Sequence, residues 1–154
     1  MKFILAASAA ILGLASAAPQ PRSDDTTFAI KDFYERKYNG KDINSVSFRI
    51  LATNGGTLDF ECSAYDPVVG HGTENFEAGK VYSCGENSFF SFSYSPDQNN
   101  ELFLWQDVSE TETLGGNICI PEPICRAGGN GINDLVCMAP PKADLKVEMK
   151  RLGA

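Results

Sequence analysis

The stretch Leu51–Tyr65, LATNGGTLDFECSAY, predicts a β-hairpin at the centre of the fold. Apolar and polar side chains alternate before its turn and again after it, and a period of two places them on opposite faces of a sheet. The turn Asn54-Gly55-Gly56 supplies residues that accept a positive φ. We therefore expect an apolar inner face and a polar outer face. The inner face would hold Val46, Phe48, Ile50 and Ala52 on the first strand and Leu58, Phe60, Cys62 and Ala64 on the second.

The rest of the chain, over residues 28–154, indicates a single all-β domain. Short runs with strand character are separated by Gly, Asn and Pro, and the first of them, at 28–37, has the irregular spacing of a bulged strand. Residues 66–79 are typical of a long surface loop, and the prolines within 118–126 restrict that segment to an edge strand or a loop. This pattern predicts an antiparallel β-sandwich or β-barrel of short strands. We favour the barrel because closure removes exposed sheet edges.

The first 18 residues have the pattern of a secretory signal peptide. Met1-Lys2 is basic, residues 3–14 form an apolar run too short to span a membrane, and Ala17 or Ala18 offers a cleavage site. We therefore expect a secreted, extracellular protein. Residues 19–27 are polar and contain two prolines, which predicts a flexible N-terminus in the mature chain.

The composition narrows the classes of partner. The chain has 20 acidic and 13 basic residues and a formal net charge of −7, and signal cleavage would remove only Lys2 and leave −8. An acidic surface argues against nucleic acid and anionic membranes as partners. Basic proteins, neutral ligands and cell-wall material remain compatible with it.

Five cysteines lie beyond the signal peptide, where an oxidising compartment favours disulfides. With one left over they allow 15 arrangements, so spacing alone does not decide the pairing. A Cys62–Cys84 bond would close the long loop. A Cys125–Cys137 bond would close the turn that lies between Cys125 and Cys137. Each bond would stabilise the fold by about 3 kcal/mol on the chain-entropy model. Cys119 would then be a free thiol, an alternative partner for Cys137 or half of an intermolecular bridge.

Four strings resemble the Alternaria major allergen (Alt a 1 type) family. They are IKDFYERK (Ile30–Lys37), ATNGGTLDF (Ala52–Phe60), YSCGENSF (Tyr82–Phe89) and CRAGGNG (Cys125–Gly131). The strings are long and span most of the chain beyond the signal peptide.

The resemblance implies a fungal secreted β-barrel without known enzymatic activity, in a family of allergens and elicitors of plant defence. It implies binding to plant thaumatin-like defence proteins and to small phenolic ligands of the flavonoid type. It also implies two disulfides, Cys62–Cys84 and Cys125–Cys137. This sequence lacks the cysteine before residue 61 that links two subunits in the family's type member, and it adds Cys119. Whether the protein forms a homodimer is therefore left open, and the resemblance does not imply a disulfide-linked dimer.

Catalytic and metal motifs are weak in this sequence. His71, the one histidine, lies between two glycines, and no CxxC pair completes a zinc site, so we expect no enzyme, no cofactor and no metal. The AGGNG turn lacks the lysine and the helix of a phosphate loop. A carboxylate pair for glycoside hydrolysis depends on a separation that the sequence does not give.

An aromatic surface is better supported. Along residues 101–108, Leu102 and Leu104 alternate with Phe103 and Trp105, so that one pair would line the barrel and the other would lie outside. On the preceding strand, Phe89 is likewise an aromatic residue that would point out of the barrel. Exposed aromatic clusters mark interaction surfaces, and Trp is a favoured anchor. The alternative is that a loop or the N-terminal segment covers these side chains.

Three functional hypotheses follow. The first is an interaction protein, perceived as an allergen or elicitor, that binds thaumatin-like proteins. We expect Phe103, Trp105 and Phe89 to help form a dimer or partner interface. The second is a carrier of a small phenolic ligand at an aromatic surface or dimer crevice. The third, which we regard as the weakest, is an enzyme acting on cell-wall carbohydrate.

Overall fold

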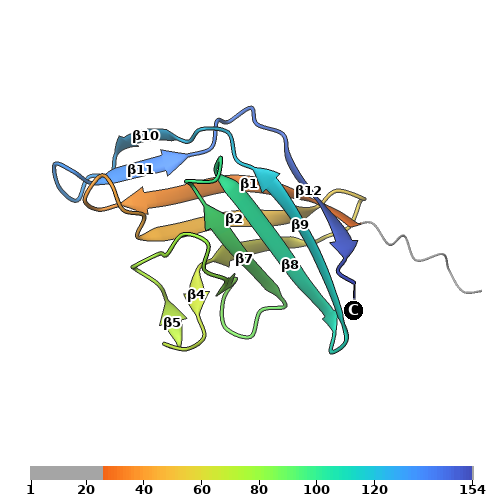
Figure 1. The fold of residues 1–154 in the computed structure, drawn as a ribbon. Coiled ribbons are helices and arrows are strands. Elements are labelled where there is room, and N and C mark those ends of the chain that lie inside the picture. Colours follow the sequence, from red (N-terminus) through yellow and green to blue (C-terminus); the bar gives the residue numbers. More distant parts are fainter. Residues whose placement is uncertain (1–25, 154) are drawn as a thin grey trace, which may run out of the picture.

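Twelve strands form one antiparallel sheet in the computed structural model, which describes residues 26–153, and no helix occurs among those residues (Figure 1). No segment in this range is therefore a helix able to cross a membrane. The strands are β1 (Thr26–Lys37), β2 (Ser45–Ala52), β3 (Asp59–Ser63), β4 (Tyr65–Asp66), β5 (His71–Gly72), β6 (Tyr82–Ser83), β7 (Phe90–Ser95), β8 (Glu101–Ser109), β9 (Glu112–Cys119), β10 (Ile124–Ala127), β11 (Leu135–Met138) and β12 (Leu145–Arg151).

The central hairpin is present with its predicted faces. Strands β2 and β3 pair antiparallel with Ile50 opposite Phe60, and Gly55 in the turn has a φ of 79°. Of the side chains predicted to face inward, Val46, Phe48, Ile50, Cys62 and Ala64 are buried. Ala52, Leu58 and Phe60, which lie nearer the turn, are half-buried. The period-two pattern therefore fixes the register of this hairpin, because a shift by one residue would turn its apolar side chains to solvent.

The sheet closes on itself where β3 passes into β4. Strand β3 pairs with β2, and after Ala64 the chain continues as β4, which pairs with β6 through Tyr65 and Ser83. Paired strands run from β3 through β2, β1, β12, β9, β8, β7 and β6 to β4. The ends of this series, β3 and β4, are joined by the chain at Ala64 and not by strand pairing, so the barrel is nearly closed. In Figure 1, β7, β8 and β9 cross in front of β1 and β2. The all-β antiparallel barrel is thereby confirmed.

Strand β1 organises the barrel because it has three partners. One edge pairs with β2, while the other is shared between β12, opposite residues 26–30, and β11, opposite residues 34–37. The register shifts between Lys31 and Tyr34, and Asp32 has a φ of 52°. This irregularity is the bulge predicted for the segment, and it lets β1 turn from one partner to the next. Beyond it, β10 and β11 form a hairpin whose strand pairing with the barrel, within residues 26–153, runs through β1.

Aromatic side chains fill the interior. Phe33 packs against Tyr94 with ring centroids 5.0 Å apart, and Phe48 packs edge-on against Phe92 at the same distance. These side chains come from β1, β2 and β7, so the contacts join opposite walls of the barrel. Edge-to-face and tilted pairs of this kind add to the stability that burial provides.

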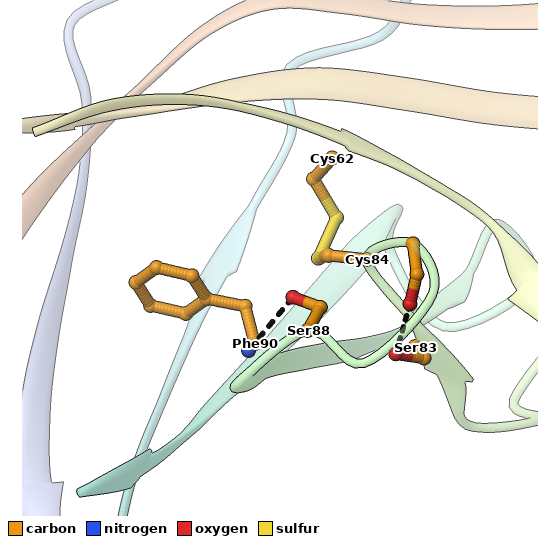
Figure 2. The surroundings of a disulfide bond; sticks show 6 residues. Cys62, Ser83, Cys84, Ser88 and Phe90 are labelled. Carbon is orange, nitrogen blue, oxygen red and sulfur yellow. Dashed lines mark hydrogen bonds between the residues drawn. A yellow bond between two sulfur atoms is a disulfide. The ribbon is translucent and has the colours of Figure 1, made fainter.

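Two disulfides cross-link the fold. Cys62 bonds to Cys84, and Cys125 bonds to Cys137, which are the pairs that the family resemblance implies. The first bond joins β3 to the residue after β6, across the seam where the barrel closes. Figure 2 shows it beside Ser88, whose Oγ accepts a 3.0 Å hydrogen bond from the backbone amide of Phe90. The second bond joins β10 to β11 at directly opposed positions.

Some boundaries differ from the expectations. Strand β1 begins at Thr26, two residues before the domain boundary expected at residue 28, because Thr26 pairs with Met149 of β12. The segment 66–79 is not wholly loop, since it contains the end of β4 and the short β5. The expected signal peptide (1–18) and residues 19–25 of the expected flexible terminus lie outside the described residues.

Candidate functional site

An aromatic pair stands on the outer face of β8. Leu102 and Leu104 are fully buried in the barrel, whereas Phe103 and Trp105 point outward and are partly exposed. The outward rings lie 5.8 Å apart at their centroids with planes 14° from parallel. In the described structure they are therefore covered neither by the core nor completely by a loop.

Small and polar side chains surround this pair. Trp105 lies opposite Ser91 on β7 and Gly115 on β9, and Phe103 lies opposite Ser93 and Asn117. Both aromatic residues stay partly exposed, while Ser93 beside Phe103 is buried. The side chain of Leu152 lies over Gly115 and extends the apolar surface beside Trp105. We call the outer face formed by Ser91, Ser93, Phe103, Trp105, Gly115, Asn117 and Leu152 the aromatic ridge.

Carboxylates flank the aromatic ridge at both ends of β8. Glu101 accepts a 2.6 Å hydrogen bond from the side-chain amide of Asn117, and Asp107 accepts a 2.8 Å bond from the hydroxyl of Thr113. Both bonds join β8 to β9 on the exposed side of the sheet. The surface thus combines an apolar centre with an acidic rim, which is the usual arrangement at protein interfaces.

Phe89 belongs to a separate aromatic group. Its side chain is 45 % exposed, as predicted for an outward residue, but its ring lies 4.7 Å from that of Phe90 and 6.1 Å from that of Phe60. It therefore packs toward the mouth of the barrel beside β3. The structure brings Phe103 and Trp105 together, whereas the ring of Phe89 contacts Phe60 and Phe90 instead.

The sequence analysis missed an apolar pocket of about 350 Å³ beside the β1 bulge. Its walls come from β1, the β10–β11 hairpin and the segment before β12; they include Ile30, Phe33, Ile124, Met138, Pro140 and Leu145. Lys31, Asp32 and Arg126 add charge to the lining. A volume of this size accommodates a small organic ligand. The bulge and Pro140-Pro141 were the available signals, but the pocket depends on segments that only the fold brings together.

The AGGNG turn has a structural role. Gly128 packs against Asp134, whose backbone carbonyl accepts a 2.7 Å hydrogen bond from the amide of Gly128. The carboxylate of Asp134 accepts a 2.9 Å hydrogen bond from the amide of Asn130 and two from the guanidinium of Arg36. The bonds from Arg36 are the main reason that the pKa of Asp134 is lowered and that of Arg36 is raised. The motif therefore anchors the hairpin to β1.

The buried acids of the described chain face basic side chains rather than one another. Asp66 accepts a 2.8 Å bond from the Nζ of Lys80, which is the main reason that its pKa is lowered. Glu35 lies 3.0 Å from the Nζ of Lys37. His71 is exposed on β5, with its ring nitrogen 2.8 Å from the carbonyl of the next residue. These arrangements are typical of structural ion pairs and an exposed loop histidine.

Comparison with known proteins assigns the family. A family model described as Alternaria alternata allergen 1 matches residues 30–137, which is more than half of the chain. The chain belongs to the Alternaria alternata allergen 1 family. It is 44 % identical to the major allergen Alt a 1 of Alternaria alternata over 149 residues, covering 89 % of each protein.

Two further allergens of this family are similar over nearly their whole length. The chain is 44 % identical to allergen Ulo b 1 of Alternaria botrytis and 42 % identical to allergen Ste b 1 of Stemphylium botryosum, in each case covering 83 % of this chain and 95 % of the relative. These names identify allergens and not enzymes.

Solved structures agree with the family assignment. A crystal structure of the Alternaria alternata major allergen matches with a TM-score of 0.73 at 43 % identity, covering 84 % of this chain and 96 % of that one. A second crystal structure of Alt a 1 matches with a TM-score of 0.70 at 41 % identity, covering 89 % and 97 %. The barrel is therefore the fold of the Alternaria alternata allergen 1 family.

Proposed function

We propose that this protein is a secreted, non-enzymatic interaction protein that binds plant thaumatin-like defence proteins through the aromatic ridge. The observation that carries the proposal is the parallel, partly exposed pair of Phe103 and Trp105 on the outer face of β8. The class of partner is the one that the family resemblance implies. Allergen and elicitor properties would follow from perception of such an exported barrel by a host.

The ridge has features that favour a protein partner. A face of this kind presents apolar area without the entropy cost of ordering long flexible side chains, since Phe and Trp have few rotatable bonds. Its rim contains Glu101 and Asp107, and the whole chain has a formal net charge of −7. A basic partner surface would therefore be steered toward this face.

A pull-down tests the proposal directly. An immobilised plant thaumatin-like protein should retain the native, disulfide-bonded chain at micromolar concentration and should lose it after reduction and unfolding. The secreted location is tested in parallel by expressing the full chain in a fungal host and sequencing the N-terminus of the product in the medium. No retention of the native chain at micromolar concentration would overturn the proposal.

The pocket beside the β1 bulge supports a second candidate, the binding of a small phenolic ligand. Its lining is mostly apolar, and the guanidinium of Arg126, exposed on β10, would donate a hydrogen bond to a phenolate oxygen. Trp105 is not among the residues that line this pocket. Saturable quenching of Trp105 fluorescence by a flavonoid would show that the ligand binds, and variants at the two positions are needed to locate it.

A pocket-filling variant separates the two ligand positions. Ala143→Phe should abolish flavonoid binding measured by calorimetry if the ligand occupies the pocket, because the added ring takes up part of its 350 Å³. Trp105→Ala should leave that binding unchanged. The reverse pattern would remove the pocket as the ligand site and would support the ridge.

A further inference from the structure

The pocket beside the β1 bulge lies at a gap in one edge of β1. On this edge β12 pairs with residues 26–30 and β11 pairs with residues 34–37, so residues 31–33 pair with neither strand. All three residues of the gap are among the walls of the pocket, which has a volume of about 350 Å³. The pocket is therefore a consequence of the way in which β1 changes partner.

Two prolines keep this gap open. Ala139 donates a 3.2 Å hydrogen bond to the carbonyl of Phe33, as β11 would if it continued along β1. The next two residues are Pro140 and Pro141, which have no amide hydrogen and cannot extend the pairing. The chain turns instead, and the amide of Ala143 donates a 2.9 Å hydrogen bond to the carbonyl of Pro140. Because proline fixes φ, this wall is stiff and the pocket exists before a ligand binds.

The lining is apolar at its deep end and cationic at its rim. Ile30, Phe33 and Leu145 are at most 5 % exposed and form the floor. Lys31 and Arg126 are exposed and stand at the opening. A ligand with an apolar body and one negatively charged end would match this arrangement.

The guanidinium of Arg126 is available to such a ligand. It makes a weak 3.8 Å contact with the Sδ of Met138, and no carboxylate within residues 26–153 forms an ion pair with it. Asp32, the carboxylate in the lining, lies 3.6 Å from the guanidinium of Arg49, which is not part of this pocket. An arginine without an acidic partner at an apolar pocket contrasts with the formal net charge of −7 of the chain. Arginine binds carboxylates through two parallel hydrogen bonds.

We propose that this pocket binds an aliphatic monocarboxylate, such as a medium-chain fatty acid, with the carboxylate on Arg126 and the alkyl chain on the apolar floor. At neutral pH a carboxylic acid is ionised and accepts two hydrogen bonds from a guanidinium, whereas a simple phenol is mostly neutral. Phe33 is the one aromatic residue in the described lining, and the flexible Met138 adapts to an alkyl chain better than to a flat ring system. The inference uses the pocket of the second candidate function with a different ligand, and it does not depend on the aromatic ridge.

An NMR titration with octanoate tests the inference, and 1-octanol serves as the neutral probe of the same chain length. We expect one octanoate per native chain, with a dissociation constant on the order of 0.1 mM and shifts centred on the amides of Ala139 and Ala143. Octanol should bind the same place roughly 10-fold more weakly, because it lacks the charged hydrogen bonds. Added salt should weaken the binding of octanoate and not that of octanol.

Two variants locate the head and the chain of the ligand. Arg126→Gln should weaken octanoate binding roughly 10-fold and leave octanol binding unchanged, since it removes the charge and keeps the floor. Ala143→Phe should abolish the binding of both probes by filling the pocket. Arg126 is exposed, so its substitution should leave the melting temperature unchanged and the result does not depend on a damaged fold.

Lys150→Gln is the matched control, since it removes one positive charge from an exposed position on β12 that does not line the pocket. It should leave octanoate binding unchanged. The proposal is overturned if octanoate shows no saturable binding at millimolar concentration, if Arg126→Gln binds octanoate as tightly as the parent, or if Lys150→Gln weakens binding equally. Binding of a flavonoid but not of octanoate to the pocket would overturn it and support the phenolic candidate instead.

Discussion

Arg36 on β1 holds Asp134 in the β10–β11 hairpin through two parallel hydrogen bonds. The Nε of Arg36 lies 3.1 Å from Oδ1 and its Nη2 lies 2.7 Å from Oδ2 of the carboxylate, which is only 1 % exposed. A bidentate pair of this kind is among the strongest hydrogen-bonded arrangements in proteins. It ties the hairpin that carries Cys125, and one wall of the apolar pocket, to the central strand of the barrel.

Asp134→Asn should destabilise the protein at neutral pH but much less in acid. The hydrogen bonds from Arg36 hold the pKa of Asp134 below its ordinary value of 3.8 in the folded state, so the ionised form stabilises the fold above that value. As the pH falls through the lower, folded-state pKa, the wild type loses this stabilisation. We expect a fall in melting temperature on the order of 5–10 °C at pH 7, narrowing below about pH 4.

Asp97→Asn is the control for that experiment, because Asp97 is an exposed acid in the turn between β7 and β8. It should change the melting temperature little at either pH. If Asp134→Asn lowers the melting temperature equally at pH 7 and pH 3, the assigned link between ionisation of Asp134 and stability is contradicted.

Gly116→Ala should destabilise the barrel far more than Gly115→Ala. A Cβ at Gly116 would overlap the backbone carbonyl oxygen of Glu148 on β12, which cannot move without breaking the sheet. A Cβ at Gly115 would instead meet the end of the Leu152 side chain at 2.9 Å, and that side chain can rotate away. We expect Gly116→Ala to lower the free energy of unfolding by about 1–3 kcal/mol and Gly115→Ala to lower it by under about 1 kcal/mol, both measured by urea denaturation. Equal costs would contradict the close approach of β9 to β12.

The Cys62–Cys84 disulfide should stabilise the closed barrel. The bond spans a sequence separation of 22 and joins the two sides of the seam between β3 and β6. Replacing both cysteines by alanine should lower the free energy of unfolding by about 3 kcal/mol, measured by urea denaturation. Tryptophan fluorescence and far-UV circular dichroism should still unfold together if the barrel remains one cooperative unit. A loss well under 1 kcal/mol would mean that the seam holds without the cross-link.

Cys119 should react as a single accessible thiol. It is the unpaired cysteine of the described chain, it is exposed on β9, and its sulfur accepts a 3.4 Å contact from the amide of Asn99. Ellman's reagent should therefore titrate one thiol per native chain, and a non-reducing gel should show the monomer. A band at twice the monomer mass that disappears in Cys119→Ser would instead establish an intermolecular bridge.

The sequence predicted the parts of the fold in which one face of a strand is buried. The alternation at residues 45–64 and 101–105 gave correct inward and outward faces, because burial on one side of a sheet imposes a period of two. The barrel and its disulfides followed from turn residues and family resemblance. The short strands β4 and β5 were not separated from loops, since two residues carry too little pattern to identify a strand.

The candidate sites were predictable only in part. Phe103 and Trp105 were identified because both lie on one strand, where alternation alone decides their direction. The contact of Phe89 with Phe60 depends on how β3 and β7 approach each other, and no local pattern encodes that. The pocket likewise combines β1 with the distant β10–β11 hairpin, so it could not be predicted from one segment.

The most direct test of the proposed interaction is the dissociation constant for a plant thaumatin-like protein, measured by calorimetry for the wild type, Trp105→Ala and Tyr38→Ala. Tyr38 is an exposed aromatic beyond the end of β1 and serves as the matched control. We predict micromolar or tighter binding by the wild type, a roughly 10–100-fold loss in folded Trp105→Ala, and no change in Tyr38→Ala. Equal affinities for all three proteins, or no binding by the wild type, would contradict the assignment of the aromatic ridge.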